Sequence, residues 1–112
     1  MTASAPISPF ARAVDMLSAL EARKLSSREL VDLHIERIQR LNPALNAIVI
    51  PTFERARAMA AEADDRRARG ERTALLGLPH TTKESNAVAG LPQSAGIEAL
   101  ARNYPESDGP LQ

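Results

Sequence analysis

The stretch that decides how this chain is interpreted is LGLPHTTKESNAVAGLPQSAG, residues 76–96. It contains Lys83, one of only two lysines in the sequence, and three of the five glycines. Glycine and proline residues, which mark turns, occur at both ends of the stretch. The short run at 78–83 between them predicts a strand. Lys83 stands where that strand gives way to loop, so its side chain can project into a cleft. The alternative is a surface lysine beside Glu84.

Two blocks of this stretch resemble the lysine-bearing segment of the amidase signature family. In that family a Gly-hydrophobic-Pro-x-x-x-Lys-Asp/Glu run precedes a segment that ends in Ala-Gly-Leu-Pro-Thr-Thr and then a glycine. The matching residues here are Gly77, Leu78, Pro79, Lys83, Glu84, Ala89, Gly90, Leu91, Pro92 and Gly96. The sequence departs from the family pattern at residues 80–82, where aliphatic residues are usual, and at Gln93-Ser94, where Thr-Thr is usual. These departures affect the packing around the lysine more than its identity.

Composition places the chain among globular proteins. Its 112 residues are enough for one domain at most, and 44% of them are apolar. Fourteen basic and fourteen acidic residues balance, which gives no electrostatic reason to expect nucleic acid or a membrane as a partner. The sequence has no cysteine, which indicates the cytoplasm and excludes disulfides and thiolate metal sites. We also expect no signal peptide and no membrane span.

The first half of the chain is expected to form two amphipathic helices. Residues 1–8 are interpreted as a flexible tail, and Ser8-Pro9 as the start of a helix over 9–23. Ser26-x-x-Glu29 matches a capping box, in which the two side chains satisfy each other's backbone N–H, and it opens a helix over 27–41. Asn42-Pro43 is expected to end that helix. Its apolar stripe is Leu30, His34, Ile38 and Leu41, widened by Val31 and Ile35.

A third helix between two short strands is expected to follow. The β-branched run at 45–50, bounded by prolines, predicts a short buried strand. Thr52 caps a helix over 52–69, which Gly70 closes, and whose apolar face is mostly alanine. With the strand at 78–83 these elements would make one crossover unit. The expected fold class is therefore α/β, with three helices and two short strands of an incomplete mixed sheet.

We interpret the polar features of the predicted helices as structural rather than as ligand-binding. His34 lies on the apolar stripe of its helix and is interpreted as a packed histidine, because no second metal-type residue lies beside it at helical spacing. The cluster Arg66-Arg67-x-Arg69 is interpreted as a solvated helix end that complements the helix dipole, rather than as an anion site. Glu62 with Arg66 and Asp65 with Arg69 are spaced for ion pairs along the helix.

The resemblance implies amide hydrolysis by a Ser–cis-Ser–Lys triad. One serine attacks the carbonyl and forms an acyl-enzyme, a second serine relays the proton, and a neutral lysine is the base. By this resemblance Lys83 is the catalytic lysine, a small-molecule amide is the substrate, and no metal or organic cofactor is implied. The family's serines lie in a Gly/Ser-rich segment that also stabilises the oxyanion. None of the eight serines here, Ser85 included, lies in such a segment.

The resemblance extends from residue 14 to residue 96 and implies a large α/β domain of which this chain holds the beginning. We therefore expect residues 9–112 to be the N-terminal part of a single, truncated amidase domain, inactive alone. An uncovered sheet face and strand edge would also favour self-association. The alternative is a small non-catalytic helical interaction protein, in which the lysine block is incidental.

Overall fold

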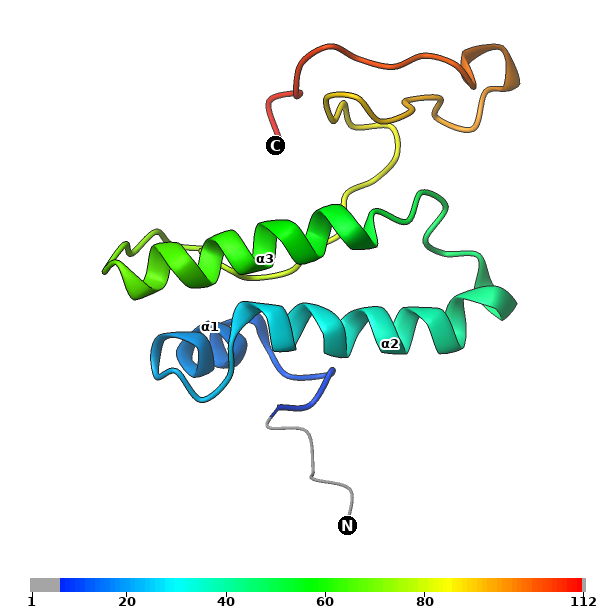
Figure 1. Cartoon of the computed structure of the whole chain (residues 1–112). Coiled ribbons are helices and arrows are strands. Elements are labelled where there is room, and N and C mark those ends of the chain that lie inside the picture. Colours follow the sequence, from blue (N-terminus) through cyan, green and yellow to red (C-terminus); the bar gives the residue numbers. More distant parts are fainter. Residues whose placement is uncertain (1–6, 112) are drawn as a thin grey trace. The chain divides into compact units, whose positions relative to one another are not determined.

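The computed structural model describes residues 7–111 and divides the chain into two compact units. We call them the helical unit, which runs to Ala47 and includes Thr52–Pro79, and the lysine unit, which comprises Ile48–Pro51 and His80–Gln112. Residues 1–6 of the predicted flexible tail lie outside the described residues. The elements, in chain order, are α1 (Ala13–Glu21), α2 (Ser27–Leu45), α3 (Phe53–Ala68) and the 3-10 helix η1 (Glu98–Leu100) (Figure 1).

Helices α2 and α3 run side by side in opposite directions within the helical unit (Figure 1). Val31 and Ile35 of α2 are buried against Ala60 of α3, and the small alanine side chain lets the two helices approach closely. A second apolar cluster joins α1 to the start of α2 and consists of Met16, Leu20, Leu25 and Leu30. Each fully buried leucine contributes about 1.5–3 kcal/mol relative to an exposed one. Three helices are therefore held by two small clusters.

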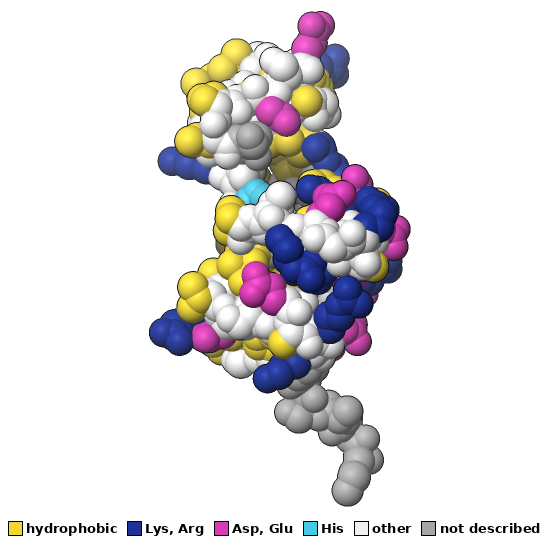
Figure 2. All heavy atoms as spheres, turned by 90° about the vertical axis from the view of Figure 1, so that its left-hand side faces the viewer, with side chains coloured by type: hydrophobic (Ala, Val, Ile, Leu, Met, Phe, Trp, Pro, Cys, Tyr) yellow, Lys and Arg dark blue, Asp and Glu magenta, His cyan; other side chains and the backbone are white. Residues whose placement is uncertain are grey.

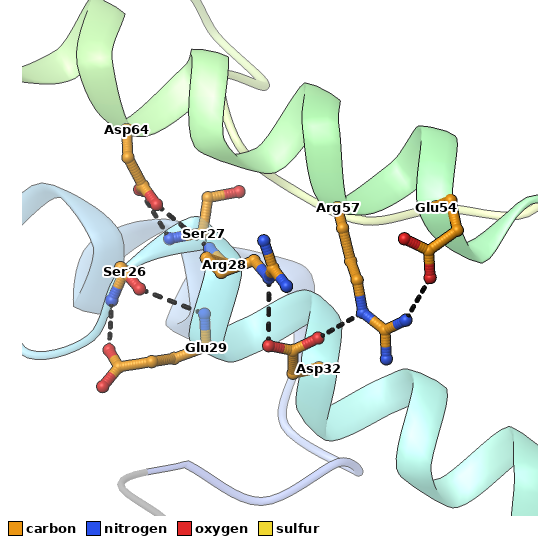
Figure 3. Close-up of polar contacts among 8 residues, drawn as sticks. All are labelled: Ser26, Ser27, Arg28, Glu29, Asp32, Glu54, Arg57 and Asp64. Atoms are coloured by element: carbon orange, nitrogen blue, oxygen red, sulfur yellow. Dashed lines mark hydrogen bonds and ion pairs between the residues drawn. The ribbon is translucent and has the colours of Figure 1, made fainter.

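The predicted capping box at the start of α2 is confirmed. The Ser26 hydroxyl accepts a hydrogen bond from the Glu29 amide at 3.0 Å, and the Glu29 carboxylate accepts one from the Ser26 amide at 2.7 Å (Figure 3). Both amides belong to the first turn of the helix, where no backbone carbonyl is in reach. The local sequence therefore correctly predicts where α2 begins.

Two helix ends, the start of α1 and the end of α2, lie four residues from their predicted positions at 9 and 41. Helix α1 begins at Ala13, because the Ser8 hydroxyl and carbonyl instead accept the amides of Phe10 and Ala11 and close a separate turn. Helix α2 continues through Pro43 to Leu45. Proline lacks only its own N–H, and in the last turn that costs a single hydrogen bond. The helix ends at Asn46, which adopts the left-handed conformation and donates its amide to the Asn42 carbonyl.

The predicted α/β fold class is wrong, because residues 7–111 form helices, turns and irregular segments but no strand. Leu45, expected to begin the first strand, belongs to α2, and the left-handed Asn46 turns the chain directly after it. In the predicted second strand, residues 79–82 form no backbone hydrogen bond with another described segment. A strand exists only where a neighbouring strand completes its ladder, so β-branched composition alone did not make one.

Ion pairs link α2 to α3. The Arg57 guanidinium lies between Asp32 at 2.9 Å and Glu54 at 2.6 Å, and Arg28 reaches the other oxygen of Asp32 at 3.1 Å (Figure 3). At the far end of α3, Arg66 and Arg69 pair with Glu71 rather than with the helical partners that their spacing predicted. Pairs of this kind at the surface each contribute about 0–1 kcal/mol, so they align the helices more than they stabilise them.

The surface of the helical unit carries both signs of charge. Figure 2 shows Lys and Arg side chains interspersed with Asp and Glu side chains on the visible face, without a single-sign patch. That face has no stripe of basic side chains of the kind that binds nucleic acid. Among the helices of residues 7–111, none combines the length and the apolar character that crossing a bilayer requires.

Candidate functional site

The segment that leads to Lys83 is anchored on the helical unit by its backbone. The Leu76 carbonyl accepts a hydrogen bond from Arg67 Nη2 at 2.5 Å, and the Gly77 carbonyl accepts one from Ser27 Oγ at 2.6 Å. The Leu76 side chain is buried, and Leu78 packs against the apolar cluster of α1 and α2. Residues 76–78 therefore have a fixed path over the helices.

Arg67 is a structural residue that the sequence interpretation missed. We expected a solvated arginine at the end of α3, yet its side chain is buried and its guanidinium binds the Leu76 carbonyl. Burying a charge is costly unless it is hydrogen-bonded, so this contact fixes the start of the lysine-bearing segment. No local signal separates Arg67 from Arg66, whose side chain reaches Glu71 instead.

Asp64 is a second residue that the sequence did not single out. Its two carboxylate oxygens accept the amides of Ser27 at 2.7 Å and Arg28 at 3.1 Å, so α3 caps the N-terminus of α2 (Figure 3). A carboxylate at this end of a helix is also favoured by the helix dipole. The capping box and Asp64 together leave few free amides there, which makes an additional anion at this helix end unfavourable.

Lys83 lies at the start of a turn in the lysine unit. Its carbonyl accepts the Asn86 amide at 2.9 Å, which closes the turn over 83–86. Its side chain is exposed, and within the part of the chain that the structure describes it forms no hydrogen bond or ion pair. The predicted placement at the end of a strand is wrong, but the lysine does stand on a turn with its amine unengaged.

Glu84 binds the loop that follows Gly90. Its carboxylate accepts the amide of Ser94 at 2.5 Å and the amide of Ala95 at 2.7 Å. These hydrogen bonds, that of Ser94 first, hold the pKa of the Glu84 carboxyl below its ordinary value. Beside them, Gln93 Nε2 donates to the Ser85 carbonyl at 2.9 Å. The lysine turn is therefore clamped to residues 93–95.

The remainder of the lysine unit is held by backbone hydrogen bonds between two irregular segments, 87–93 and 103–109. They join the amides of Gly90, Gln93 and Gly109 to carbonyls across the unit. The Asp108 carboxylate also accepts the Ala89 amide at 2.8 Å. The 3-10 helix η1, Glu98–Leu100, lies between these two segments in the chain. This scaffold supports the lysine turn without forming a sheet.

The described residues supply an amine but no nucleophile beside it. No serine hydroxyl within residues 7–111 is hydrogen-bonded to Lys83, and Ser85 uses its carbonyl, not its hydroxyl, in the contact with Gln93. In the same residues, no three His, Asp or Glu side chains are grouped as ligands of a metal ion. The geometry alone therefore shows a lysine on a turn that hydrogen bonds hold in place, which is one part of a catalytic site.

Comparisons with known proteins agree with the resemblance of the lysine stretch. The model of the Amidase family matches residues 29–111, a range that includes Lys83 and Glu84. The chain is 42% identical over 86 residues to a glutamyl-tRNA(Gln) amidotransferase subunit from Granulibacter bethesdensis, covering 77% of this chain and 17% of that protein. It is 36% identical over 100 residues to indoleacetamide hydrolase from Bradyrhizobium diazoefficiens, covering 88% of this chain and 19% of that enzyme.

Solved structures give the same result. One is a bacterial aryl acylamidase described as an amidase signature enzyme, with a TM-score of 0.78 and 31% identity over 85% of this chain and 20% of that one. Another comes from a vestigial complex related to an s-triazine catabolic enzyme, with a TM-score of 0.82 and 30% identity over 88% of this chain and 22% of that one. The chain thus spans about a fifth of the length of the proteins it matches. With most of its residues matched by the family model, this chain belongs to the amidase family.

Proposed function

We propose that this chain supplies the lysine base of an enzyme that hydrolyses amide C–N bonds by acyl transfer. The observation that carries the proposal is the match of the amidase family model across Lys83, on a turn where the amine has no partner within residues 7–111. Relatives named as an indoleacetamide hydrolase and an aryl acylamidase support this reaction class. They also favour catalysis over the alternative of a non-catalytic helical interaction protein.

In the proposed reaction, neutral Lys83 accepts the proton of the nucleophilic serine through the second serine. The serine oxygen bonds to the amide carbon, the C–N bond breaks, and the amine leaves with the returned proton. Water then hydrolyses the acyl-enzyme by the same proton route and releases the acid. These 112 residues hold no Gly/Ser-rich segment, so the proposal places both serines and the oxyanion hole outside this sequence.

The proposed substrate class is a small-molecule amide, and the proposed compartment is the cytoplasm, in line with the cysteine-free sequence. The names of two relatives, an indoleacetamide hydrolase and an aryl acylamidase, support this substrate class. The assignment of residues 9–112 to a single amidase domain remains a prediction.

A chimera tests the role of Lys83. The aligned segment of the indoleacetamide hydrolase is replaced by the aligned part of this chain, which is 88% of its residues, and hydrolysis of indoleacetamide is measured. Lys83→Ala is expected to lower kcat by at least about a hundredfold, the scale of a lost general base. Lys24→Ala removes the only other lysine of this chain and should keep kcat within about twofold of the parent chimera. An inactive parent chimera, or an active Lys83→Ala variant, contradicts the proposal.

The chain by itself is expected to hydrolyse no simple amide above the uncatalysed rate. A base without a nucleophile and an oxyanion hole cannot form the acyl-enzyme. The purified chain is assayed with indoleacetamide and with an aryl amide, beside a Lys83→Ala variant. Turnover that disappears in the variant would show that the catalytic groups are complete within these 112 residues, against this prediction.

A further inference from the structure

We propose that Glu84 is the positioning residue for Lys83: its carboxylate binds the consecutive amides of Ser94 and Ala95 and so fixes the turn that carries the lysine. The inference rests on the proposed role of Lys83 as the catalytic base. Glu84 is one peptide bond from the lysine, so a restraint on its side chain is passed directly to the lysine backbone. It acts through that backbone and does not touch the reacting atoms.

Both oxygens of the Glu84 carboxylate are used in this contact. Oε1 accepts the Ser94 amide at 2.5 Å and Oε2 accepts the Ala95 amide at 2.7 Å. Hydrogen bonds to an ionised acceptor are shorter and stronger than those between neutral groups. Two such bonds to neighbouring amides fix the direction of the carboxylate as well as its distance. The loop and the lysine turn are therefore joined in one orientation.

The loop that receives Glu84 has a strained backbone. Ala95 has φ of 51°, and Gly96 follows with φ of 75°. Glycine adopts this left-handed conformation freely, whereas in alanine the Cβ comes unfavourably close to a carbonyl oxygen. A strained residue persists only where its surroundings hold it. The Ala95 amide is one of the two groups that Glu84 binds, so the carboxylate holds the strained residue in place.

A second contact joins the same loop to the same turn. Gln93 Nε2 donates to the Ser85 carbonyl at 2.9 Å, and the Gln93 carbonyl accepts Asn103 Nδ2 at 2.9 Å. Lys83 therefore begins a turn with Glu84 and Ser85 both attached to residues 93–95. Glu84 provides the two charge-assisted bonds of this clamp, and Gln93 provides a single neutral one. Removing the Glu84 carboxylate should loosen the turn without releasing it fully.

The opposing interpretation is that Glu84 stabilises the lysine unit as a whole. The unit contains hydrogen bonds that do not involve Glu84 or its loop partners and that report on this alternative. They include the Gly90 amide to the Pro105 carbonyl at 2.9 Å and the Gly109 amide to the Ala87 carbonyl at 2.9 Å. A positioning role predicts that these amides stay protected when Glu84 is changed. A general stabilising role predicts that they lose protection together with Ser94 and Ala95.

Amide hydrogen exchange and ¹⁵N relaxation on the 112-residue chain test the inference directly. Glu84→Ala should speed exchange at Ser94 and Ala95 by at least about tenfold and increase motion of the Lys83 amide. Glu84→Gln, which keeps one acceptor oxygen, should give an intermediate effect. Glu106→Gln removes an exposed carboxylate of the same unit and should leave all these signals unchanged. An unchanged Lys83 amide overturns the inference, and so does a uniform loss of protection that includes Gly90 and Gly109.

The chimera described above measures the consequence for catalysis. Glu84→Ala should lower kcat by about 10- to 100-fold, the scale of a misplaced catalytic group, with KM kept within about twofold. Glu84→Gln should recover part of kcat. Unchanged kcat, or a loss confined to KM, overturns the positioning role. An inactive parent chimera counts against the proposed base, while the exchange experiment on the chain still decides whether Glu84 fixes the lysine turn.

Discussion

At the scale of single residues, Gly77 decides how the lysine-bearing segment meets the helices. Its φ of 81° is left-handed, and a Cβ built on it would lie 3.0 Å from the Ser27 hydroxyl oxygen. Ser27 is only 1% exposed and donates to the Gly77 carbonyl, so it has little room to move away. Gly70 is also left-handed, with φ of 91°, but a Cβ there meets nothing within 4 Å. Comparing Gly77 with Gly70 therefore separates the cost of the left-handed backbone from the cost of crowding against Ser27.

Gly77→Ala is therefore expected to destabilise the chain more than Gly70→Ala. The left-handed conformation costs alanine about 1–2 kcal/mol at either position. Crowding against Ser27 should add about 1–3 kcal/mol at Gly77 only. The urea midpoints of the two variants, followed by circular dichroism at the same low protein concentration, rank the two losses. Equal losses in the two variants would mean that the segment does not pack on Ser27 in solution.

His34 is the other residue whose environment has a measurable consequence. Its Nε2 is buried and has no hydrogen-bond partner among residues 7–111, which agrees with the interpretation as a packed histidine. Burial first, and then the charge of Arg37, lower the pKa of His34 below its ordinary value of 6.5. The neutral ring is thus favoured in the folded chain.

Stability is expected to fall as the pH falls through the region of 6.5, the ordinary pKa of histidine. In that range the unfolded chain binds a proton at His34 that the folded chain does not, so acid favours unfolding. The loss is complete below the lowered pKa of the folded state. Urea unfolding at about pH 7.5 and about pH 5.5, on either side of the ordinary value, should show this difference, and His34→Gln should reduce it. His80→Gln, which changes the exposed second histidine, serves as the control; an equal effect of both substitutions would refute the assignment.

At the scale of elements, the N-terminus of α2 is the best-determined part of the helical unit. The local box of Ser26 and Glu29 and the distant carboxylate of Asp64 satisfy amides of the same first turn. Because Asp64 belongs to α3, the cap also sets where the two helices meet. One helix end therefore combines a secondary-structure signal with a tertiary contact.

Ser26→Ala is expected to lower the free energy of unfolding by about 1 kcal/mol, the usual value of an N-cap. Asp64→Ala should cost about 1–3 kcal/mol, because it leaves two amides of α2 without their acceptor. Thermal unfolding monitored by helical circular dichroism measures both changes. Ser107→Ala, at an exposed serine of the lysine unit, should have no effect. A Ser26→Ala variant as stable as Ser107→Ala would contradict the role of the box.

At the scale of the whole molecule, large apolar side chains are more often exposed than buried among residues 7–111. Val14 is 59% exposed, Leu75 67% and Leu45 69%, and Figure 2 shows apolar side chains on the visible surface. An open strand edge, which the sequence suggested as a cause of self-association, does not apply, because these residues form no strand. Exposed apolar area remains as a reason for chains to associate.

The isolated chain is accordingly expected to self-associate and to unfold with weak cooperativity. Its apolar clusters are small, and ordering each residue costs of order 1–2 kcal/mol of conformational entropy. Size-exclusion chromatography with light scattering over a range of concentrations measures the association, and urea titration measures the cooperativity. A monodisperse monomer with a steep transition would contradict this expectation and favour an independently folded module.

The sequence by itself determined the features that depend on neighbours in the chain: the capping box of α2, the close of α3 before Gly70, and the motif around Lys83 that marks the family. Tertiary structure decided the rest. Ser27 bonds to partners 37 and 50 residues away, and Glu84 to amides 10 and 11 residues away, at separations that no local pattern encodes. The two predicted strands are absent from the described residues for the same physical reason. A β-ladder needs a second segment to pair with, and periodicity within one segment does not supply it.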